Sequence, residues 1–205
     1  MHILHLTSGE ITEGAFIGAY QLHKGLKKLK VDSKILTNSL RLPQDDGIST
    51  IADSSFTRIK SKLNKKIDIG LSKFYRRRKK VIFSTGWGND LSNNKLIKSA
   101  DIIHLHWVNR GFLDMNQLKK FRKPIVWTMR DMWPMTGGCH YSIECDRYQV
   151  GCGKCVQLGS TKTNDLSRYV LNKKKKSIPE NITLVGISEW LCSCAEKSEL
   201  FRGYK

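Results

Sequence analysis

Short apolar runs alternate along this chain with longer segments in which apolar residues recur every three or four positions. Short runs bounded by loop residues are typical of buried strands, and the wider spacing is typical of helices that pack one side on a core. Five strands are predicted in this way: His2–Leu6, Ser33–Thr37, Asp101–His106, Lys123–Thr128 and Ile182–Ile187.

Segments with helical spacing lie between these strands. The clearest is Ala15–Lys30, where the apolar residues share one side and lysines occupy the other. We also expect a short helix near Asp114–Phe121, a helix that starts near Asp165, and a helix over Glu189–Glu199 with Ser188 as its N-cap. Strands that alternate with helices predict an α/β fold with a parallel sheet and helices on its faces.

The charge of the chain is concentrated in one segment. The net charge is +18, and residues 58–80 hold eleven basic residues and one acidic residue, which gives +10 of that total. Apolar residues recur at helical spacing among these charges, from Ile59 to Phe74. A basic amphipathic helix suits an anionic membrane surface. The alternative is a helix that packs on the domain and keeps its basic face in water.

Other charge features point away from binding. We expect Lys173–Lys176 to be the solvated end of a helix, because charge runs usually lie in water. The basic residues gather in one helix without a nucleic-acid motif, so no nucleic-acid partner is expected. A hydrophobic fraction of 40% is sufficient for a core and argues against global disorder.

The N-terminus begins with a strand-like run and lacks the basic region of a signal peptide. No apolar run approaches the roughly 20 residues that span a bilayer. We therefore expect a cytoplasmic location, where the six cysteines would stay reduced or bind metal.

The most informative stretch is Lys123–Cys155. Its β-branched run stops at Arg130 and Asp131, and a loop with tryptophan, glycine and cysteine residues follows. Open α/β sheets build their sites where strands end in such loops. Arg130 and Asp131 are therefore candidates for binding a substrate, although adjacent opposite charges can also form a local ion pair or cap a turn.

Two other loops are expected at the same edge of the sheet. Gly14 and Ala15 open the first helix, where backbone N–H groups could approach an anion or a sugar. His104 and His106 alternate on one strand and share a face. We expect His104 to be buried, while His106 and Trp107 lie at the strand end, where a sugar could bond to imidazole and stack on indole.

Four cysteines follow in the loop with the spacing C-x5-C-x6-C-x2-C: Cys139, Cys145, Cys152 and Cys155. The C-x2-C pair is a good half-site for tetrahedral zinc, and His140 could replace one thiol. Any metal would be structural. Disulfides and free thiols packed in the loop are the alternatives.

Several segments, in this order, resemble a known family: MHILHLTSGEITEGAFIGAYQLHKGLKKL, DIIHLHWVNRGFL, KPIVWTMRDMWPMTGGCHY with CDRYQVGCGKC, and ITLVGISEWLCSCAEKSELF. The chain resembles the N-terminal half of a GT-B glycosyltransferase of family 4, in the bacterial branch that includes colanic-acid-type enzymes. The resemblance implies one Rossmann-like acceptor domain over residues 1–205, with a basic helical insertion at 58–80, a Cys-rich loop at 132–160, and no C-terminal donor-binding domain.

The resemblance also implies a function. Such enzymes, here expected to be of the retaining type, move a sugar from a nucleotide-sugar donor to a saccharide or lipid-linked acceptor in surface-polysaccharide synthesis, on the inner side of the membrane and without a catalytic cofactor. Arg130, Asp131 and His106 would be the catalytic residues. Substrate-binding residues would be Gly14, Ala15, Trp107, Trp133, Gly137 and Gly138.

One position departs from the family pattern. The family commonly has histidine followed by aspartate where this chain has Arg130 and Asp131. Arginine stays charged and cannot act as a base, but it could anchor a phosphate or an acidic sugar. Taken alone, the chain is expected to be inactive. The main alternative function is a domain that binds glycans or membranes without catalysis, and a second is a nucleic-acid-binding module, which the charge and the cysteine cluster suggest.

Overall fold

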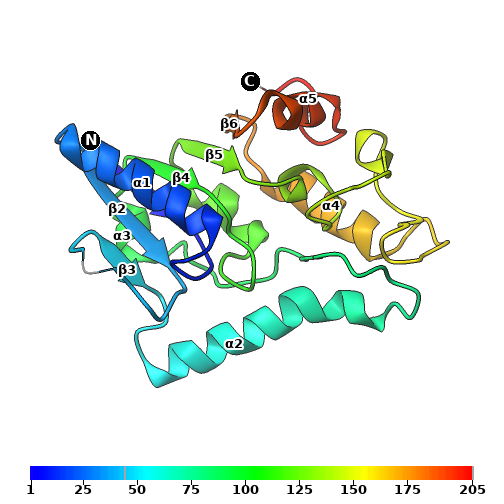
Figure 1. Ribbon diagram of the computed structural model, residues 1–205, viewed down its shortest axis with the longest axis horizontal. Coiled ribbons are helices and arrows are strands. Elements are labelled where there is room, and N and C mark those ends of the chain that lie inside the picture. Colours follow the sequence, from blue (N-terminus) through cyan, green and yellow to red (C-terminus); the bar gives the residue numbers. More distant parts are fainter. Residues whose placement is uncertain (44, 205) are drawn as a thin grey trace.

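Six parallel strands form one open sheet in the order β3-β2-β1-β4-β5-β6. The computed structural model describes residues 1–43 and 45–204. The strands are β1 (His2–Leu6), β2 (Asp32–Thr37), β3 (Ile48–Thr50), β4 (Ile102–Leu105), β5 (Ile125–Met129) and β6 (Thr183–Gly186). The chain winds outward from β1 in both directions, so the carboxyl ends of β1 and β4 meet at the centre of the sheet (Figure 1).

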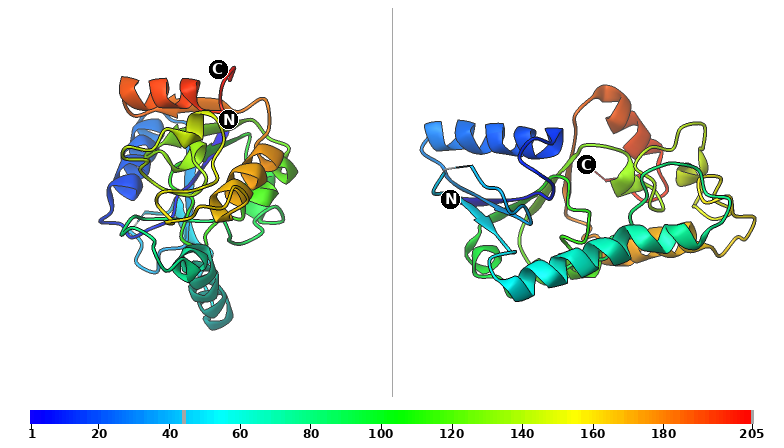
Figure 2. Two further views of the ribbon diagram at one scale, coloured as in Figure 1. Left: turned by 90° about the vertical axis from the view of Figure 1, so that its right-hand side faces the viewer. Right: turned by 60° about the horizontal axis from the view of Figure 1, so that its bottom comes forward.

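Helices cover both faces of the sheet. In Figures 1 and 2, α1 lies on one face, and η2 and α4 lie on the other. The α-helices are α1 (Gly14–Lys28), α2 (Ser55–Gly70), α3 (Lys95–Ser99), α4 (Leu166–Ser177) and α5 (Glu189–Lys197). The 3₁₀ helices are η1 (Leu71–Phe74), η2 (Met115–Phe121), η3 (Trp133–Met135) and η4 (Arg147–Gln149).

The predicted α/β fold, a Rossmann-like parallel sheet with helices on both faces, is confirmed. All five predicted strands are present within two residues of their expected bounds. The expected helix near Asp114–Phe121 is a 3₁₀ helix rather than an α-helix. Two short elements, β3 and α3, were not predicted, because three and five residues are too few to show a period.

The main core lies between the sheet and the helices on its η2–α4 face. Leu105 and Ile103 of β4 and Trp127 of β5 are almost fully buried there. Trp127 contacts both Trp133 and Phe201, with ring centroids 6.1 and 6.4 Å apart. Buried aromatic side chains of this size dominate core energetics, so this cluster fixes the position of the loop after β5.

Helix α2 is attached to the rest of the protein by polar side chains. Asn64 and Asp68 are buried, and Asp68 accepts hydrogen bonds from Thr85 N (2.8 Å), Thr85 Oγ1 (3.1 Å), Trp87 N (3.2 Å) and Gly111 N (3.3 Å). Asn64 Nδ2 donates to Asn89 Oδ1 at 3.0 Å. The helix therefore lies along the outside of the molecule, as Figures 1 and 2 show.

The apolar side of this segment points away from the domain. Phe56, Ile59 and Leu63 are 75%, 67% and 56% exposed, and Phe74 in η1 is 84% exposed. The amphipathic helix predicted near residues 59–75 is present, but Ile59, Leu63 and Phe74 are not used for packing on the domain. Among the described residues, no helix is both long enough and apolar enough to cross a bilayer.

The prediction that Lys173–Lys176 is a solvated charge run is wrong for two of the four residues. Lys173 and Lys174 are buried. Lys173 Nζ lies 2.9 Å from Gly86 O and 3.1 Å from Asp114 Oδ1. Lys174 Nζ donates to Thr136 O at 2.9 Å and to Trp133 O. Hydrogen bonds to these acceptors offset the desolvation of the two ammonium groups. The acceptors lie in distant segments of the chain, so the sequence alone did not indicate them.

Candidate functional site

The carboxyl ends of β1 and β4 and the start of α1 form a shared rim. His106 N donates to Leu6 O at 3.0 Å, and Ser8 N donates to Trp107 O at 2.6 Å. Ser8 Oγ donates to the same carbonyl at 2.8 Å. These bonds extend the β1–β4 pairing past the strand ends and hold the loops that follow close together.

Arg130 follows β5 and reaches across this rim. Its Nη2 lies 3.1 Å from His106 Nδ1, and its guanidinium lies against Gly18 of α1, where a Cβ atom would overlap it. Arg130 Nε is buried without a hydrogen-bond partner, and no carboxylate lies within 4.0 Å of the guanidinium among residues 1–43 and 45–204. Burial lowers the pKa of Arg130, but arginine stays protonated at neutral pH. The rim therefore holds a half-buried cation suited to an anionic partner.

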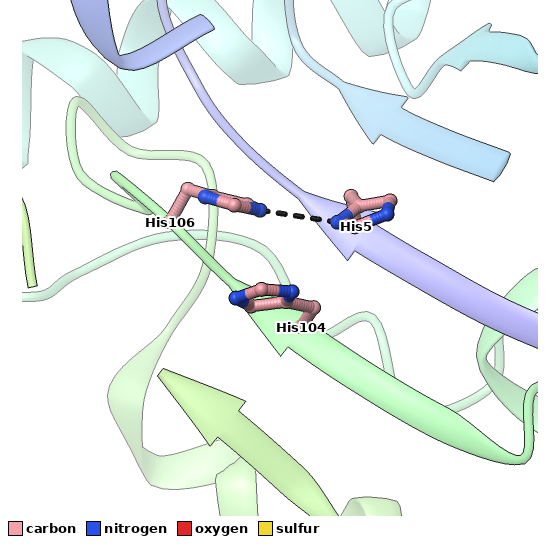
Figure 3. Close-up of side chains that lie close together, drawn as sticks. All are labelled: His5, His104 and His106. Atoms are coloured by element: carbon pink, nitrogen blue, oxygen red, sulfur yellow. Dashed lines mark hydrogen bonds between the residues drawn. The ribbon is translucent and has the colours of Figure 1, made fainter. Parts of the chain in front are cut away.

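Three histidines lie close together, as Figure 3 shows, and one of them, His106, contacts Arg130. His5 Nδ1 lies 3.1 Å from His106 Nε2, and His104 Nε2 lies 2.8 Å from Thr128 Oγ1. Arginine can only donate, so His106 Nδ1 accepts from Arg130 and His106 Nε2 carries a proton. That proton is donated to His5 Nδ1, which places the remaining ring proton on the buried and unpartnered His5 Nε2.

The three rings are neutral at pH 7. Burial lowers the pKa of His5 to about 3 and that of His104 to about 4. The pKa of His106 is well below its ordinary value, mainly because of burial and also because of the charges of His104, His5 and Arg130. Neutral imidazoles are good metal ligands, and the three ligand atoms lie within 4.8 Å of one another.

The position of Arg130 argues against a metal ion at these histidines. Its donation to His106 Nδ1 keeps the proton on His106 Nε2, which is the atom that faces His5 and would have to bind the metal. A guanidinium 3.1 Å from one ligand would also repel a cation. The arrangement is better described as a neutral hydrogen-bonded chain that holds Arg130 in place.

Asp131 connects three parts of the site. Its Oδ2 accepts from Trp107 Nε1 at 2.8 Å and lies 2.6 Å from His140 Nδ1. Its Oδ1 accepts from Trp133 N at 2.8 Å. His140 Nε2 in turn lies 3.1 Å from Ser84 Oγ. Because both carboxylate oxygens are occupied, Asp131 orients Trp107 and anchors the loop in this conformation.

A cavity of about 210 Å³ opens beside the rim, between the ends of β1 and β2 and helix α2. Arg110 at its edge pairs with Glu13, the N-cap residue of α1, at 2.5 Å and lies 4.9 Å from the Trp107 ring centroid. Basic side chains dominate the charged lining. The lining residues that can bond to a ligand include Asn38, Ser39, Arg58, Ser61, Lys62, Lys65 and Arg110.

The structure brings some of the predicted site residues together and separates others. Arg130, Asp131, His106 and Trp107 gather at the rim, and Gly14 and Ala15 form the first turn of α1 nearby. The remaining three predicted residues, Trp133, Gly137 and Gly138, are buried in the loop and not at the rim. Trp133 Nε1 donates to Ser84 O at 2.9 Å, and the two glycines lie against Cys152, Ser167 and Phe83.

The expected difference in burial between His104 and His106 is reversed. His106 is 2% exposed, with both ring nitrogens engaged, while His104 is half-buried. Sequence reasoning also missed His5, Gly18 and Arg110. Nothing in the sequence of the first strand distinguishes His5 as a site residue. Gly18 could have been found, because it lies four residues after Gly14 and therefore on the same side of α1, one turn further along.

Replacement of Gly18 by alanine is expected to move Arg130 without unfolding the protein. The new Cβ would overlap the guanidinium, which can swing away because it is the end of a flexible side chain. Loss of the Arg130 bond should change the ring-nitrogen shifts of His106 in long-range ¹H–¹⁵N spectra. Gly25→Ala on the same helix is the control, since no atom lies within 4 Å of the added Cβ. It should raise stability by about 0.5–1 kcal/mol and leave His106 unchanged; identical His106 shifts in all three proteins would contradict the expectation.

Comparison with known proteins gives one partial similarity. No protein-family model matches the sequence. Over 63 residues the chain is 32% identical to a protein described as the putative colanic acid biosynthesis glycosyl transferase WcaC of Escherichia coli (strain K12). The similar region is 29% of this chain and 16% of that relative, so it spans about a sixth of the relative's length.

Proposed function

We propose that this chain is the acceptor-binding domain of a glycosyltransferase that moves a sugar from a nucleotide-sugar donor to a saccharide or lipid-linked acceptor in bacterial surface-polysaccharide synthesis. The half-buried guanidinium of Arg130 at the carboxyl rim of a parallel sheet carries the proposal, since no carboxylate of the described residues lies within 4.0 Å of it. The partial similarity to a described glycosyl transferase supports the reaction class. In this proposal a second Rossmann-like domain binds most of the donor, as in GT-B enzymes of family 4 with a retaining mechanism.

Each rim residue has a binding role in this proposal. Arg130 pairs with a phosphate or an acidic sugar, and its planar fork suits two-point recognition of either group. Trp107 is partly exposed and held by Asp131, so its ring can stack on a sugar. The first-turn amides of Gly14 and Ala15 have no side-chain cap and add further donors at the positive end of α1.

The rim positions substrates and does not supply a base. Transfer forms a bond between an acceptor hydroxyl and the anomeric carbon of the donor sugar, while the nucleoside diphosphate leaves with the bonding electrons and takes up the proton of the hydroxyl. Arg130 is protonated, His106 has both nitrogens engaged, and Asp131 has both oxygens engaged. This chain therefore contributes orientation, and stabilisation of the leaving diphosphate falls to the donor side.

An acceptor carried on a membrane lipid fits the surroundings of the cavity. Arg58, Lys62 and Lys65 of α2 line the cavity, and Phe56, Ile59 and Leu63 of the same helix are exposed. In the proposal this outer face lies in the interface of an anionic bilayer, where a lipid-linked diphosphate would stand next to the basic side chains. The protein would then be peripheral on the inner face of the membrane.

Removal of the exposed apolar side chains is expected to weaken binding to vesicles that contain phosphatidylglycerol. The Phe56→Ser, Ile59→Ser and Leu63→Ser variants combined should lower the partition coefficient by at least about 100-fold, since each large apolar side chain that is buried contributes about 1.5–3 kcal/mol. Co-sedimentation measures it. Leu29, Val150 and Ile187 are exposed in other parts of the chain, and their combined replacement by serine is the matched control. Equal loss in both triple variants would rule out a specific role of α2.

The function itself is tested by acceptor binding and by transfer. The chain should bind a polyprenyl-diphosphate-linked sugar in nanodiscs more tightly than the same sugar on an uncharged polyprenol. Together with the donor-binding domain of a related transferase, it should transfer labelled sugar from a nucleotide-sugar to that acceptor. Acceptor binding without transfer in any such combination would instead favour a non-catalytic glycan-binding domain, which the occupied His106 and Asp131 side chains also suit.

A further inference from the structure

The Cys-rich loop (residues 132–160) is long and has little regular structure of its own. Between β5 and α4 it contains two three-residue 3₁₀ turns, η3 and η4. Several of its residues have positive φ, including two that are not glycine, Ile143 (54°) and Lys154 (46°). Ordering so many residues costs conformational entropy, and long loops without secondary structure are uncommon in compact domains. Interactions other than the backbone hydrogen bonds of helices and sheets must therefore hold this loop in place.

The loop has four cysteines at its centre. Cys139, Cys145, Cys152 and Cys155 all line one cavity of about 10 Å³, and all four are free thiols. A space of this size holds a single water-sized particle. It is too small for an organic ligand and suits one metal ion.

A backbone hydrogen-bond donor points at one of these sulfur atoms. Gly137 N donates to Cys152 Sγ at 3.2 Å. A thiol is a weak acceptor, whereas a thiolate bound to metal accepts such bonds readily and is oriented by them. The Gly137 amide is therefore placed to orient a Cys152 thiolate on a metal ion.

A buried cation lies next to the same cysteines. Lys174 is 0% exposed, and its ammonium bonds to backbone carbonyls with no carboxylate within 4.0 Å in the described part of the chain. Burial lowers the pKa of Lys174 to about 7, and negative charge on Cys139 and Cys152 would oppose that shift. The carbonyl groups compensate the ammonium only in part, and thiolates at this place would stabilise its charged form further.

We propose that Cys139, Cys145, Cys152 and Cys155 bind one structural zinc ion. Four thiols lose their protons to solvent as Zn²⁺ binds, and the resulting centre carries a charge of −2, with the Lys174 ammonium beside it. His140 does not replace a thiol, because Asp131, Ser84 and Asn109 surround its two nitrogens. No three of these four sulfurs lie within 4.8 Å of one another, so zinc binding requires the thiols to move inward, among them that of the partly exposed Cys145.

The metal content of the purified protein tests this site. Protein made without chelator under reducing conditions should contain about one zinc per chain by mass spectrometry of the metal. Metal-free protein titrated with Co²⁺ should develop the charge-transfer bands of tetrahedral cobalt–thiolate coordination. Neither readout depends on glycosyl transfer, so the outcome is independent of the proposed function.

Variants separate this site from the alternatives. Cys152→Ser and Cys155→Ser should lose zinc, while Cys192→Ser and Cys194→Ser on α5 should keep it. If the Cys152→Ser and Cys155→Ser variants fail to fold, two measurements on the wild-type protein still test the zinc site. These are the cobalt spectrum and the protection of four thiols by zinc against a thiol reagent. Zinc-free protein with a featureless cobalt spectrum, disulfides among these cysteines, or zinc lost only on His5→Ala would overturn the proposal.

Discussion

Replacement of Arg130 by glutamine is expected to weaken binding of a diphosphate-linked acceptor by about 10- to 100-fold. A hydrogen bond to a charged group contributes about 1.5–3 kcal/mol, and each 1.4 kcal/mol corresponds to a tenfold change in affinity. Arg130 has no carboxylate partner among the described residues, so its charge is available to the acceptor. Isothermal titration with the acceptor in nanodiscs measures the effect.

Two further variants distinguish a local role from the general basicity of the chain. Arg122→Gln removes the same charge just before β5, at the opposite edge of the sheet, and should leave affinity unchanged. Arg130→Lys keeps the charge but loses the two-point fork, so its affinity should be intermediate. If Arg122→Gln and Arg130→Gln weaken binding equally, the acceptor responds to net charge and not to the rim.

Acidification from pH 7 to 4.5 is expected to lower the free energy of unfolding by about 3 kcal/mol for each histidine that stays neutral in the folded protein. The folded-state pKa of His5 is about 3 and that of His104 about 4, against an ordinary value of 6.5. Below pH 6.5 the unfolded chain therefore binds protons that the folded chain does not. The stability is fully present above pH 6.5 and is lost as the pH falls toward 4. The three rings interact, so their contributions do not simply add.

The histidine contribution can be isolated from that of the carboxylates. Asp45, whose pKa is lowered to about 2 mainly by its hydrogen bond from Lys27, loses its contribution mostly below pH 4. Burial raises the pKa of Asp68, which acts in the opposite direction. His104→Gln leaves both carboxylates unchanged and should reduce the slope of stability against pH between 6.5 and 4.5 in urea unfolding. An unchanged slope would show that His104 takes up a proton in the folded protein.

The fold could be predicted largely from sequence because its signals are local. Runs such as His2–Leu6 are apolar enough to identify buried strands without knowledge of their neighbours. The three residues of β3 carry no such signal, since that strand forms by pairing with β2 at the edge of the sheet. The side of α2 that faces the domain was also not predictable. It depends on hydrogen bonds to Asp68 from the backbone amides of Thr85, Trp87 and Gly111, which lie in distant segments of the chain.

The site could be predicted only in part. Strand ends indicated where Arg130, Asp131 and Trp107 would meet, since parallel strands end at one edge. The roles of these residues depend on contacts across the fold. The hydrogen bond that His106 accepts from Arg130 determines which ring nitrogen of His5 carries the proton, and His5 lies 101 residues away from His106 in the sequence. The buried state of Lys174 likewise depends on carbonyl groups of Trp133 and Thr136, about 40 residues earlier in the chain.

The polar attachment of α2 has a consequence for how this protein can change. Asn64 and Asp68 fix the helix from one side, so substitutions on its opposite side leave the folded core untouched. Selection can therefore change the hydrophobicity of that outer side independently of folding stability.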